Sequence, residues 1–316
     1  MKLTLTHAWL NAAALEAGRV GAATIDLDHL YLGLLGVGGA AARLLGRHGV
    51  SLTSARARVR DLLAADLAGL GVGEAATLLP EPLTQPADRF PVDLSDRARP
   101  LVAASGKSPD TFALLLLLLQ EPSGVVRRLV HADGILPQDL AAPLKEGSDE
   151  PYATDKATLL PGVLPRPAFA RSVTHFVAAS PDHVLAVLGD PAVLPLVGPG
   201  DDPDQDPTTA DGIVLSSRGG HRSMRVRAAL RPDADGSGLT WVWELLDTAW
   251  SGQNLTYHQF VANPAPGGTD LTHTLGYRTF GTVGRLMEPF TRRLAGGAGL
   301  MHQRYALAAH IAETDA

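Results

Sequence analysis

A change in residue pattern near residue 145 constrains the fold more than any other feature of the sequence. Residues 145–166 combine Gly, Pro and charged residues with little apolar periodicity, which is typical of a linker. Before it the chain has Ala- and Leu-rich helical patterns, and after it apolar and polar residues alternate as they do in strands. We therefore expect an all-α domain at 1–145, a linker at 146–166 and an α+β domain at 167–314.

The composition excludes several classes of protein. The sequence has no cysteine, so thiol nucleophiles, disulfides and thiolate metal sites are absent. A net charge of −6 offers no general attraction to phosphate backbones, so we expect no nucleic-acid partner. The longest apolar run, 112–119, is far shorter than the ~20 residues of a membrane span, and the polar start lacks a secretory signal. We expect a cytoplasmic protein with no membrane span, no metal and no cofactor.

An eight-residue block occurs twice in the helical half. Residues 43–50 match residues 128–135 in position and character, and a Leu-rich helical pattern precedes each block. Gly49 and Gly134 fall where a helix ends, and glycine tolerates the left-handed conformation found there. The sequence predicts two copies of a unit of several short helices, at about 3–66 and 92–144, joined by an extended connector at 69–89.

The first copy carries a recognisable motif. Residues 21–35 hold a Gly-rich turn, an Ile, then Asp28 and His29 leading a Leu-rich helix. This resembles the double repeat at the N-terminus of Clp-family unfoldases, in which a Thr or Ser opens the first helix and an acidic residue and a His precede the Leu-rich one. The second copy has Ser95 near its opening and Phe112 in place of the acidic residue. The resemblance covers residues 3–144.

The resemblance implies a domain that receives substrates and adaptors, and some members of that family bind phosphorylated arginine. Carried over, Asp28 would accept the guanidinium hydrogen bonds while Thr4 or Thr6 contacts the phosphate. We add His29, Ser95 and Phe112 as further candidate site residues. In the alternative interpretation, Asp28 only caps a helix that begins at His29, and His29 fixes the turn.

The chain lacks the motor of the unfoldases. Its single Gly-Lys-Ser sequence, at 106–108, has no first glycine of a phosphate-binding loop, and a proline follows at once. A receiver domain without a motor can only bind, as an adaptor or as a decoy that competes with the Clp machinery. Its ligand would be a Clp-directed peptide, a phosphoarginine protein or a cyclic peptide antibiotic. Phe112 favours an apolar groove between the repeats, which an antibiotic would need.

The second half predicts strands and helices in a diagnostic order. We expect a strand at 169–178, helices at 181–188 and 191–197, strands at 212–217, 222–231, 239–246, 254–261 and 270–277, and a helix at 283–314. Helical spacing predicts a buried face of Leu286, Phe290, Leu294, Ala298, Met301, Tyr305 and Ala309, with a bend or a close approach to the sheet at the glycines of 296–299.

This order resembles the START-like superfamily of polyketide cyclases and dehydrases (SRPBCC), also called the helix-grip fold. Local sequences at 239–241, 268–271 and 281–289 support the resemblance, which spans residues 167–314. It implies a sheet that curls round the last helix and leaves a cavity for lipids, polyketides or other hydrophobic small molecules.

Alternation along the strands selects candidate cavity residues. Side chains two residues apart share a face, which groups Trp241 with Trp243, Tyr257 with Gln259, and His273 with Tyr277. The aromatic rings would supply apolar contact, while His273, Tyr277 and Gln259 would orient polar groups of the ligand. Two alternatives stay open: the opposite phase puts His258, Glu244 and Arg278 inside, or the aromatics are simply core.

The candidate acids and bases are scattered over several strands without a diagnostic spacing. Our main hypothesis is therefore a binding protein without ATPase activity. The alternatives are a polyketide cyclase-like enzyme that carries a Clp-like interaction domain, and a regulator in which the cavity ligand changes how the helical half docks.

Overall fold

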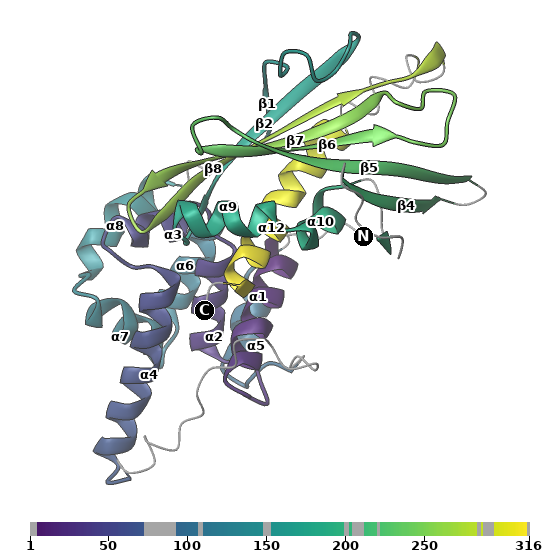
Figure 1. Cartoon of the computed structure of the whole chain (residues 1–316). Helices are drawn as coiled ribbons and strands as arrows, with labels where there is room; N and C mark the ends of the chain where they lie inside the picture. Colours follow the sequence, from purple (N-terminus) through teal and green to yellow (C-terminus); the bar gives the residue numbers. More distant parts are fainter. Residues whose placement is uncertain are drawn as a thin grey trace.

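The computed structural model describes residues 5–72, 93–106, 110–147, 153–198, 202–203, 212–219, 222–282, 286 and 294–314. Thr4, most of the predicted connector at 69–89 and most of residues 283–293 lie outside these ranges. The first half of the described chain is helical, and the second half is an antiparallel sheet packed on helices, as Figure 1 shows. In the part of the chain described, no helix is both long and apolar enough to cross a lipid bilayer.

The helical half repeats one order of helices. The first copy contains α1 (Leu5–Arg19), α2 (Leu27–Gly36), α3 (Gly39–Gly46) and α4 (Leu52–Gly69), and the second contains α5 (Ala98–Ala104), α6 (Thr111–Gln120), α7 (Val125–Ala132) and α8 (Pro137–Glu146). Helices α6, α7 and α8 begin 84 to 86 residues after α2, α3 and α4. Helices α6, α7 and α8 thus repeat the order and the spacing of α2, α3 and α4.

The two copies also share their helix ends. Asp26 caps α2 by accepting a hydrogen bond from the backbone N–H of Leu27 at 2.9 Å, and Asp110 caps α6 by accepting from Ala113 at 2.7 Å. Gly49 and Gly134 both have positive φ, 86° and 78°. The alternative that Asp28 caps a helix starting at His29 is wrong in position, because α2 starts at Leu27. The imidazole of His29 does fix the turn, by accepting from the N–H of Asp26 at 3.1 Å.

The C-terminal half contains an eight-stranded sheet with the order β1-β2-β8-β7-β6-β5-β4-β3, and every pairing is antiparallel. The strands are β1 (Asp155–Lys156), β2 (Ala168–Val177), β3 (Asp202–Pro203), β4 (Ile213–Gly219), β5 (Arg222–Pro232), β6 (Gly238–Leu245), β7 (Asn254–Ala265) and β8 (Gly268–Arg278). Helices α9 (Pro181–Gly189), α10 (Leu194–Val197) and α12 (Leu300–Thr314) lie against one face, with a short 3-10 turn, Pro191–Val193, before α10 (Figure 1). This is the helix-grip arrangement that the resemblance implied.

The predicted linker is partly structural. Val163 and Leu164 are buried against Val242 and Tyr257, on the face of the sheet that points away from α12, and β1 extends the sheet edge. Residues 145–146 belong to the end of α8, and 148–152 lie outside the described chain. The apolar residues of 159–164 pack on β6 and β7. The Pro and Gly content of the predicted linker gives no indication of this packing.

The last helix buries Tyr305 as predicted, but its buried face is otherwise shifted. Leu286 is 80% exposed and Ala298 is exposed, Met301 and Ala309 are half-buried, and the side chains of Phe290 and Leu294 lie outside the described part. The buried residues of α12 are Leu300, Arg304, Tyr305, Leu307, Ala308, Ile311 and Ala312. A six-residue π-helix, Leu294–Gly299, precedes α12 and contains the glycines that predicted an irregularity. Because a π-turn adds a residue to each turn, it rotates the following helix relative to a regular 3.6-residue pattern.

The two halves are packed together. The main core cluster of the helical half also contains Phe176 of β2 and Tyr305 and Ala312 of α12. At the turn before α3, a Cβ on Gly38 would lie 2.0 Å from the carbonyl oxygen of Phe176, so only glycine permits this approach. Helix α12 therefore lies between the sheet and helices α1 and α2 (Figure 1).

Candidate ligand-binding site

The strand register defines which residues face α12. Trp241 pairs with His258, Trp243 with Thr256, and Phe260 with His273, and residues paired across strands point to the same side. Trp241, Trp243 and Phe260 pack with apolar residues of α9, α10 and α12. We call this side the inner face; its candidate residues are Trp241, Trp243, His258, Phe260, His273 and Tyr277.

Tyr257 and Gln259 lie on the opposite, outer face, so they do not join the two tryptophans as predicted. Their partners across the strand are Val242 and Thr240. The hydroxyl of Tyr257 accepts a hydrogen bond from the N–H of Leu160 at 3.0 Å and is covered by the 159–164 stretch. Alternation fixes faces within each strand but not between strands. His258, which the sequence placed inside only in the opposite phase, lies on the inner face of β7 together with Phe260.

The centre of the inner face is a hydrogen-bonded pair of histidines. Nδ1 of His258 lies 2.8 Å from Nε2 of His273, and the two residues are 3% and 2% exposed. The ring of Phe260 stacks on His273 at 4.5 Å between centroids, and Trp243 meets His258 edge-on at 5.0 Å. The pair is thus held rigidly between aromatic rings.

Both imidazoles are neutral at physiological pH. Burial lowers the pKa of His258 to about 3, and burial together with the neighbouring His258 lowers the pKa of His273 well below its ordinary value. A neutral imidazole has one N–H and one lone pair. If His258 donates to His273, then Nδ1 of His273 carries a proton and is a donor; if His273 donates, the same Nδ1 is an acceptor. The histidine pair can therefore bind either a hydrogen-bond acceptor or a hydrogen-bond donor through Nδ1 of His273.

On this face, Nε1 of Trp243 and Nδ1 of His273 are buried and have no hydrogen bond among the described residues, and the same holds for Nδ1 of His175 on β2. The other ring nitrogen of His175 is already bonded to the carbonyl of Val37. The indole of Trp241, by contrast, donates to the carbonyl of Leu188 at 2.8 Å. A buried polar group left unpaired costs about 1–3 kcal/mol, so native proteins rarely keep one without a function. Trp243 and His273 are therefore the inner-face residues best suited to hold a polar group of a ligand.

The candidate residues of the helical half do not form one site. Asp28 and His29 line a pocket of about 250 Å³ between α1, α2 and α4, but Thr6 does not line it. Ser95 instead donates its hydroxyl proton to Oδ1 of Asp26 at 2.7 Å, and Phe112 is buried beside a separate pocket. Only Asp28 and His29 of the predicted set are brought together.

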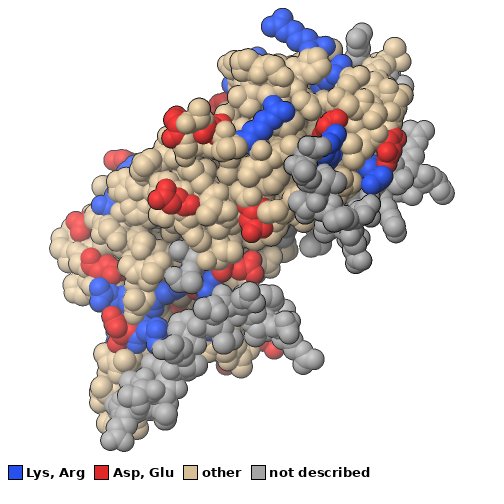
Figure 2. Space-filling model, viewed as in Figure 1, with Lys and Arg blue, Asp and Glu red and all other residues tan. Residues whose placement is uncertain are grey.

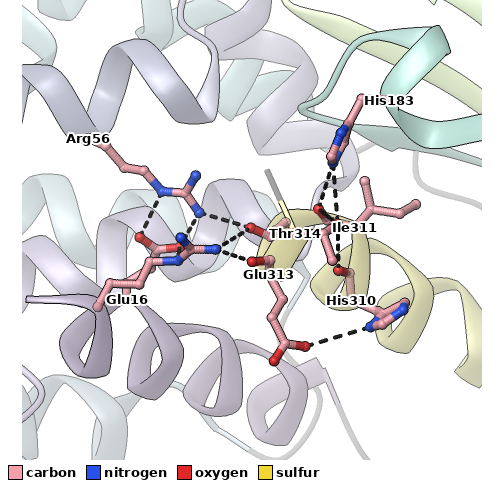
Figure 3. Close-up of polar contacts among 9 residues, drawn as sticks. Glu16, Arg56, His183, His310, Ile311, Glu313 and Thr314 are labelled. Atoms are coloured by element: carbon pink, nitrogen blue, oxygen red, sulfur yellow. Dashed lines mark hydrogen bonds and ion pairs between the residues drawn. The ribbon is translucent and has the colours of Figure 1, made fainter. Parts of the chain in front are cut away.

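The same pocket is lined by residues that hold the end of α12. Arg56 forms two hydrogen bonds to Glu16, at 2.7 and 3.0 Å, and donates to the carbonyl of Ala312 at 2.9 Å (Figure 3). Arg19 donates to the same carbonyl at 3.3 Å and also to that of Glu313. We call Glu16, Arg19 and Arg56 the α12 clamp. It supplies donors to helix-terminal carbonyls that no intrahelical N–H can reach.

A small pocket of about 160 Å³ lies between the copies of the repeat, where the sequence predicted a groove, and Phe112 lines it together with Ala40 and Arg43 of α3. A larger groove lies within the second copy. It has a volume of about 690 Å³ between α6, α7 and α8. Apolar residues make most of its wall: Leu116, Leu119, Val130, Ile135, Leu136, Leu140, Ala141 and Leu144. Arg127, Arg128 and His131 form a basic edge, and no acidic residue lines it. Among the described residues, no group of three or more His, Asp or Glu side chains is placed to hold a metal ion.

No protein-family model and no curated protein sequence matches the chain. Among solved structures it is similar to the Mll3558 protein of Rhizobium loti, with 21% identity and a TM-score of 0.30 over 44% of this chain and 96% of that chain. It is also similar to the Zhui aromatase/cyclase of Streptomyces sp. R1128, with 15% identity and a TM-score of 0.30 over 44% of this chain and 93% of that one. A third is the protein TTHA0849 of Thermus thermophilus, with 12% identity and a TM-score of 0.34 over 46% and 99%. These matches do not assign a ligand or an activity.

Proposed function

We propose that the inner face of the sheet binds a neutral, apolar small molecule, such as a lipid or a polyketide-like compound, that carries at least one polar group. The observation that supports this most directly is that Nε1 of Trp243 and Nδ1 of His273 are buried without a hydrogen bond among the described residues, next to the apolar core of the sheet half. A ligand carbonyl or hydroxyl would satisfy them, and the neutral histidine pair would adjust its tautomer to the group it meets. A charged ligand would be disfavoured, because an apolar wall does not replace its hydration.

The test is ligand recovery followed by titration of the full chain. Mass spectrometry of the purified protein identifies a bound molecule, and Nile red, a neutral dye with a carbonyl group, serves as a probe. We expect Trp243→Phe, which keeps an aromatic ring but removes the N–H, to weaken binding about tenfold, the effect of one lost hydrogen bond. The control is Trp250→Phe, since Trp250 is 40% exposed. Equal affinity of wild type and Trp243→Phe would contradict the proposal.

We propose for the helical half the role of a protein-interaction module of Clp type, an adaptor or a decoy. The pocket at Asp28 supports phosphoarginine as one ligand, because it combines a carboxylate for a guanidinium with the guanidinium groups of Arg19, Arg56 and Arg60 for a phosphate. The apolar groove of the second copy supports a peptide or a cyclic peptide antibiotic. Titration of phosphoarginine against wild type and Asp28→Ala tests the first site; no binding, or equal binding, removes it.

The histidine pair also favours a second candidate function, a cyclase-like enzyme. Two hydrogen-bonded neutral imidazoles can accept a proton on one ring while the other ring releases one, so no charged imidazolium is needed in the apolar site. Incubation of the recovered ligand with wild type and His258→Asn distinguishes the two functions. Conversion by wild type alone supports the enzyme, whereas return of unchanged ligand in both supports the binding protein.

A further inference from the structure

The internal repeat lets the two copies be compared position by position. In the matched blocks Arg43 corresponds to Arg128, and Gly46 corresponds to His131. In the first copy these positions are covered by the C-terminal half. Arg43 forms an ion pair with Asp270 of β8 at 2.7 Å and lies over the ring of Phe176 at 5.6 Å.

The contact at Gly46 is closer still. A Cβ at this position would lie 2.5 Å from the carbonyl oxygen of Pro266, in the turn between β7 and β8, and 3.2 Å from the ring of Phe176. The side of α3 that carries Arg43 and Gly46 is therefore covered by polypeptide of the same chain. The covering groups are the turn at residues 266–267, between β7 and β8, and the carboxylate of Asp270.

The corresponding side of α7 carries no such cover among the described residues, and it opens into the α6–α8 groove. Leu116 and Leu136 on the groove wall are 41% and 40% exposed, which is high for leucine beside a buried core. Arg128 is paired only with Asp66 of α4, and both side chains are 49% exposed. An exposed ion pair of this kind contributes little, so a partner's carboxylate can share the guanidinium.

The charged residues that line the groove indicate which kind of molecule it can bind. The groove lining contains Arg127, Arg128 and His131 and no acidic residue, and Arg127 has no ion pair among the described residues. Figure 2 shows basic and acidic side chains close together on the visible face of the helical half. In the groove, Arg128 is paired with Asp66 of α4, whereas Arg127 keeps its charge without a carboxylate beside it among the described residues. The net positive charge of the groove lining therefore favours an anionic partner.

We propose that the groove between α6, α7 and α8 binds a polypeptide segment in which apolar side chains are flanked by carboxylates. The proposal deepens the protein-interaction role proposed for the helical half and rests on it. The apolar side chains enter the groove wall while the carboxylates meet Arg127 and Arg128, as Asp270 meets Arg43 in the first copy. A volume of about 690 Å³ accommodates several side chains.

Fluorescence anisotropy on the full chain tests this with two short labelled peptides. The first carries Leu and Glu at helical spacing, and in the second Lys replaces every Glu. We expect the Glu peptide to bind at least about tenfold more tightly, and its affinity to fall as salt is raised. Arg127→Glu and, separately, Leu136→Glu each weaken the Glu peptide about tenfold or more. The matched control is Leu70→Glu at the end of α4, since Leu70 is 78% exposed and lies outside the groove.

The possible results distinguish peptide binding in the groove from the interaction role proposed for the whole helical half. Equal binding of the two peptides, or Glu-peptide binding unchanged in Arg127→Glu and Leu136→Glu, overturns the groove while leaving the interaction role in place. Failure of both peptides to bind also overturns the groove, whereas the interaction role is then decided by the phosphoarginine titration at the Asp28 pocket. Sedimentation that shows a dimer disrupted by Leu136→Glu makes a second copy the occupant and also overturns it. Nile red binding to Leu136→Glu checks that the sheet, and hence the fold, is intact.

Discussion

Trp241 and Trp243 are similar in burial, 2% and 0% exposed, but different in bonding. The indole of Trp241 satisfies the carbonyl of Leu188, whereas that of Trp243 has no partner among the described residues. Trp241→Phe takes the indole hydrogen bond away from the buried carbonyl of Leu188. Trp243→Phe removes an N–H that makes no hydrogen bond among the described residues. We expect Trp241→Phe to lower the free energy of unfolding by about 1 kcal/mol more than Trp243→Phe. Urea denaturation of both variants measures it, and equal losses would contradict the assignment of Trp243 to ligand binding.

The buried histidines predict how stability depends on pH. Burial lowers the pKa of His258 to about 3, and burial with the nearby Arg304 lowers that of His175 to about 3, against about 6.5 in an unfolded chain. Below pH 6.5 the unfolded chain binds protons that the folded chain does not, so the stability present above about pH 6.5 is lost as the pH falls toward 3. Each histidine contributes a slope of about 1 kcal/mol per pH unit.

Urea denaturation at about pH 7.5 and about pH 5 measures this loss. Replacing His175 by Phe should reduce the slope, since His175 is fully buried against Tyr305 and bonded to the carbonyl of Val37. His48→Gln is the control, because His48 is exposed on the surface of the helical half. A slope that His175→Phe leaves unchanged would show that this histidine is protonated in the folded state.

Residue patterns correctly predicted that Trp241 shares a face with Trp243 and His273 with Tyr277, but they placed Gln259 on the wrong face relative to the tryptophans. Alternation within β6 and β8 is a local property, so the shared faces of Trp241 with Trp243 and of His273 with Tyr277 were predictable. The phase of β7 relative to β6 depends on the register across the strands, and a bulge between Trp243 and Glu244 changes it further. No single-strand pattern contains that information, which explains why His258 stayed an alternative.

At the scale of elements, the strand limits were predictable because alternation and turn residues are local signals. The predicted strand at 239–246 is β6, Gly238–Leu245, and the predicted helix at 181–188 is α9, Pro181–Gly189. The face of α12 was not predictable, because the preceding π-helix changes its phase. The glycines did indicate an irregularity at that place, but a sequence pattern does not distinguish a bend from a π-turn.

The α12 clamp makes the end of one half depend on the other. Arg56→Gln removes two bonds to Glu16, which is 5% exposed, and a bond to the carbonyl of Ala312. The buried carboxylate of Glu16 loses its two hydrogen bonds and keeps only the ion pair with Arg19 at 3.8 Å among the described residues, so we expect the free energy of unfolding to fall by about 2 kcal/mol. We also expect faster amide exchange in the last turn of α12, which hydrogen exchange with mass spectrometry measures.

The matched control for the clamp is Arg58→Gln on the same helix. Arg58 binds Asp133 at 3.0 Å within the helical half and is 37% exposed, so its loss should cost below about 1 kcal/mol and leave α12 unchanged. If Arg56→Gln and Arg58→Gln have the same effect on exchange in α12, the clamp does not hold the helix.

At the scale of the whole molecule, the change from helices to strands after residue 145 was predictable and the contact between the halves was not. Composition changes along the chain, and that change is visible in the sequence. The packing of Phe176 against α3 and of Ala312 against α1 and α2 joins residues far apart in the sequence, and no local pattern encodes it. Two domains thus remain our proposal for the architecture, but with a shared core and not a free tether.

The shared core predicts that the halves unfold together. Helix α12 contributes Leu307 and Ile311 to the sheet core and Tyr305 and Ala312 to the helical core, so neither half can open without exposing apolar surface of the other. In a Trp9→Phe variant the remaining tryptophans, Trp241, Trp243 and Trp250, all lie in the sheet half, whereas far-UV circular dichroism is dominated by helices. We expect both signals to change at the same urea concentration. If the fluorescence changes at a different concentration from the dichroism, the halves unfold separately and the contact through α12 is too weak to couple them.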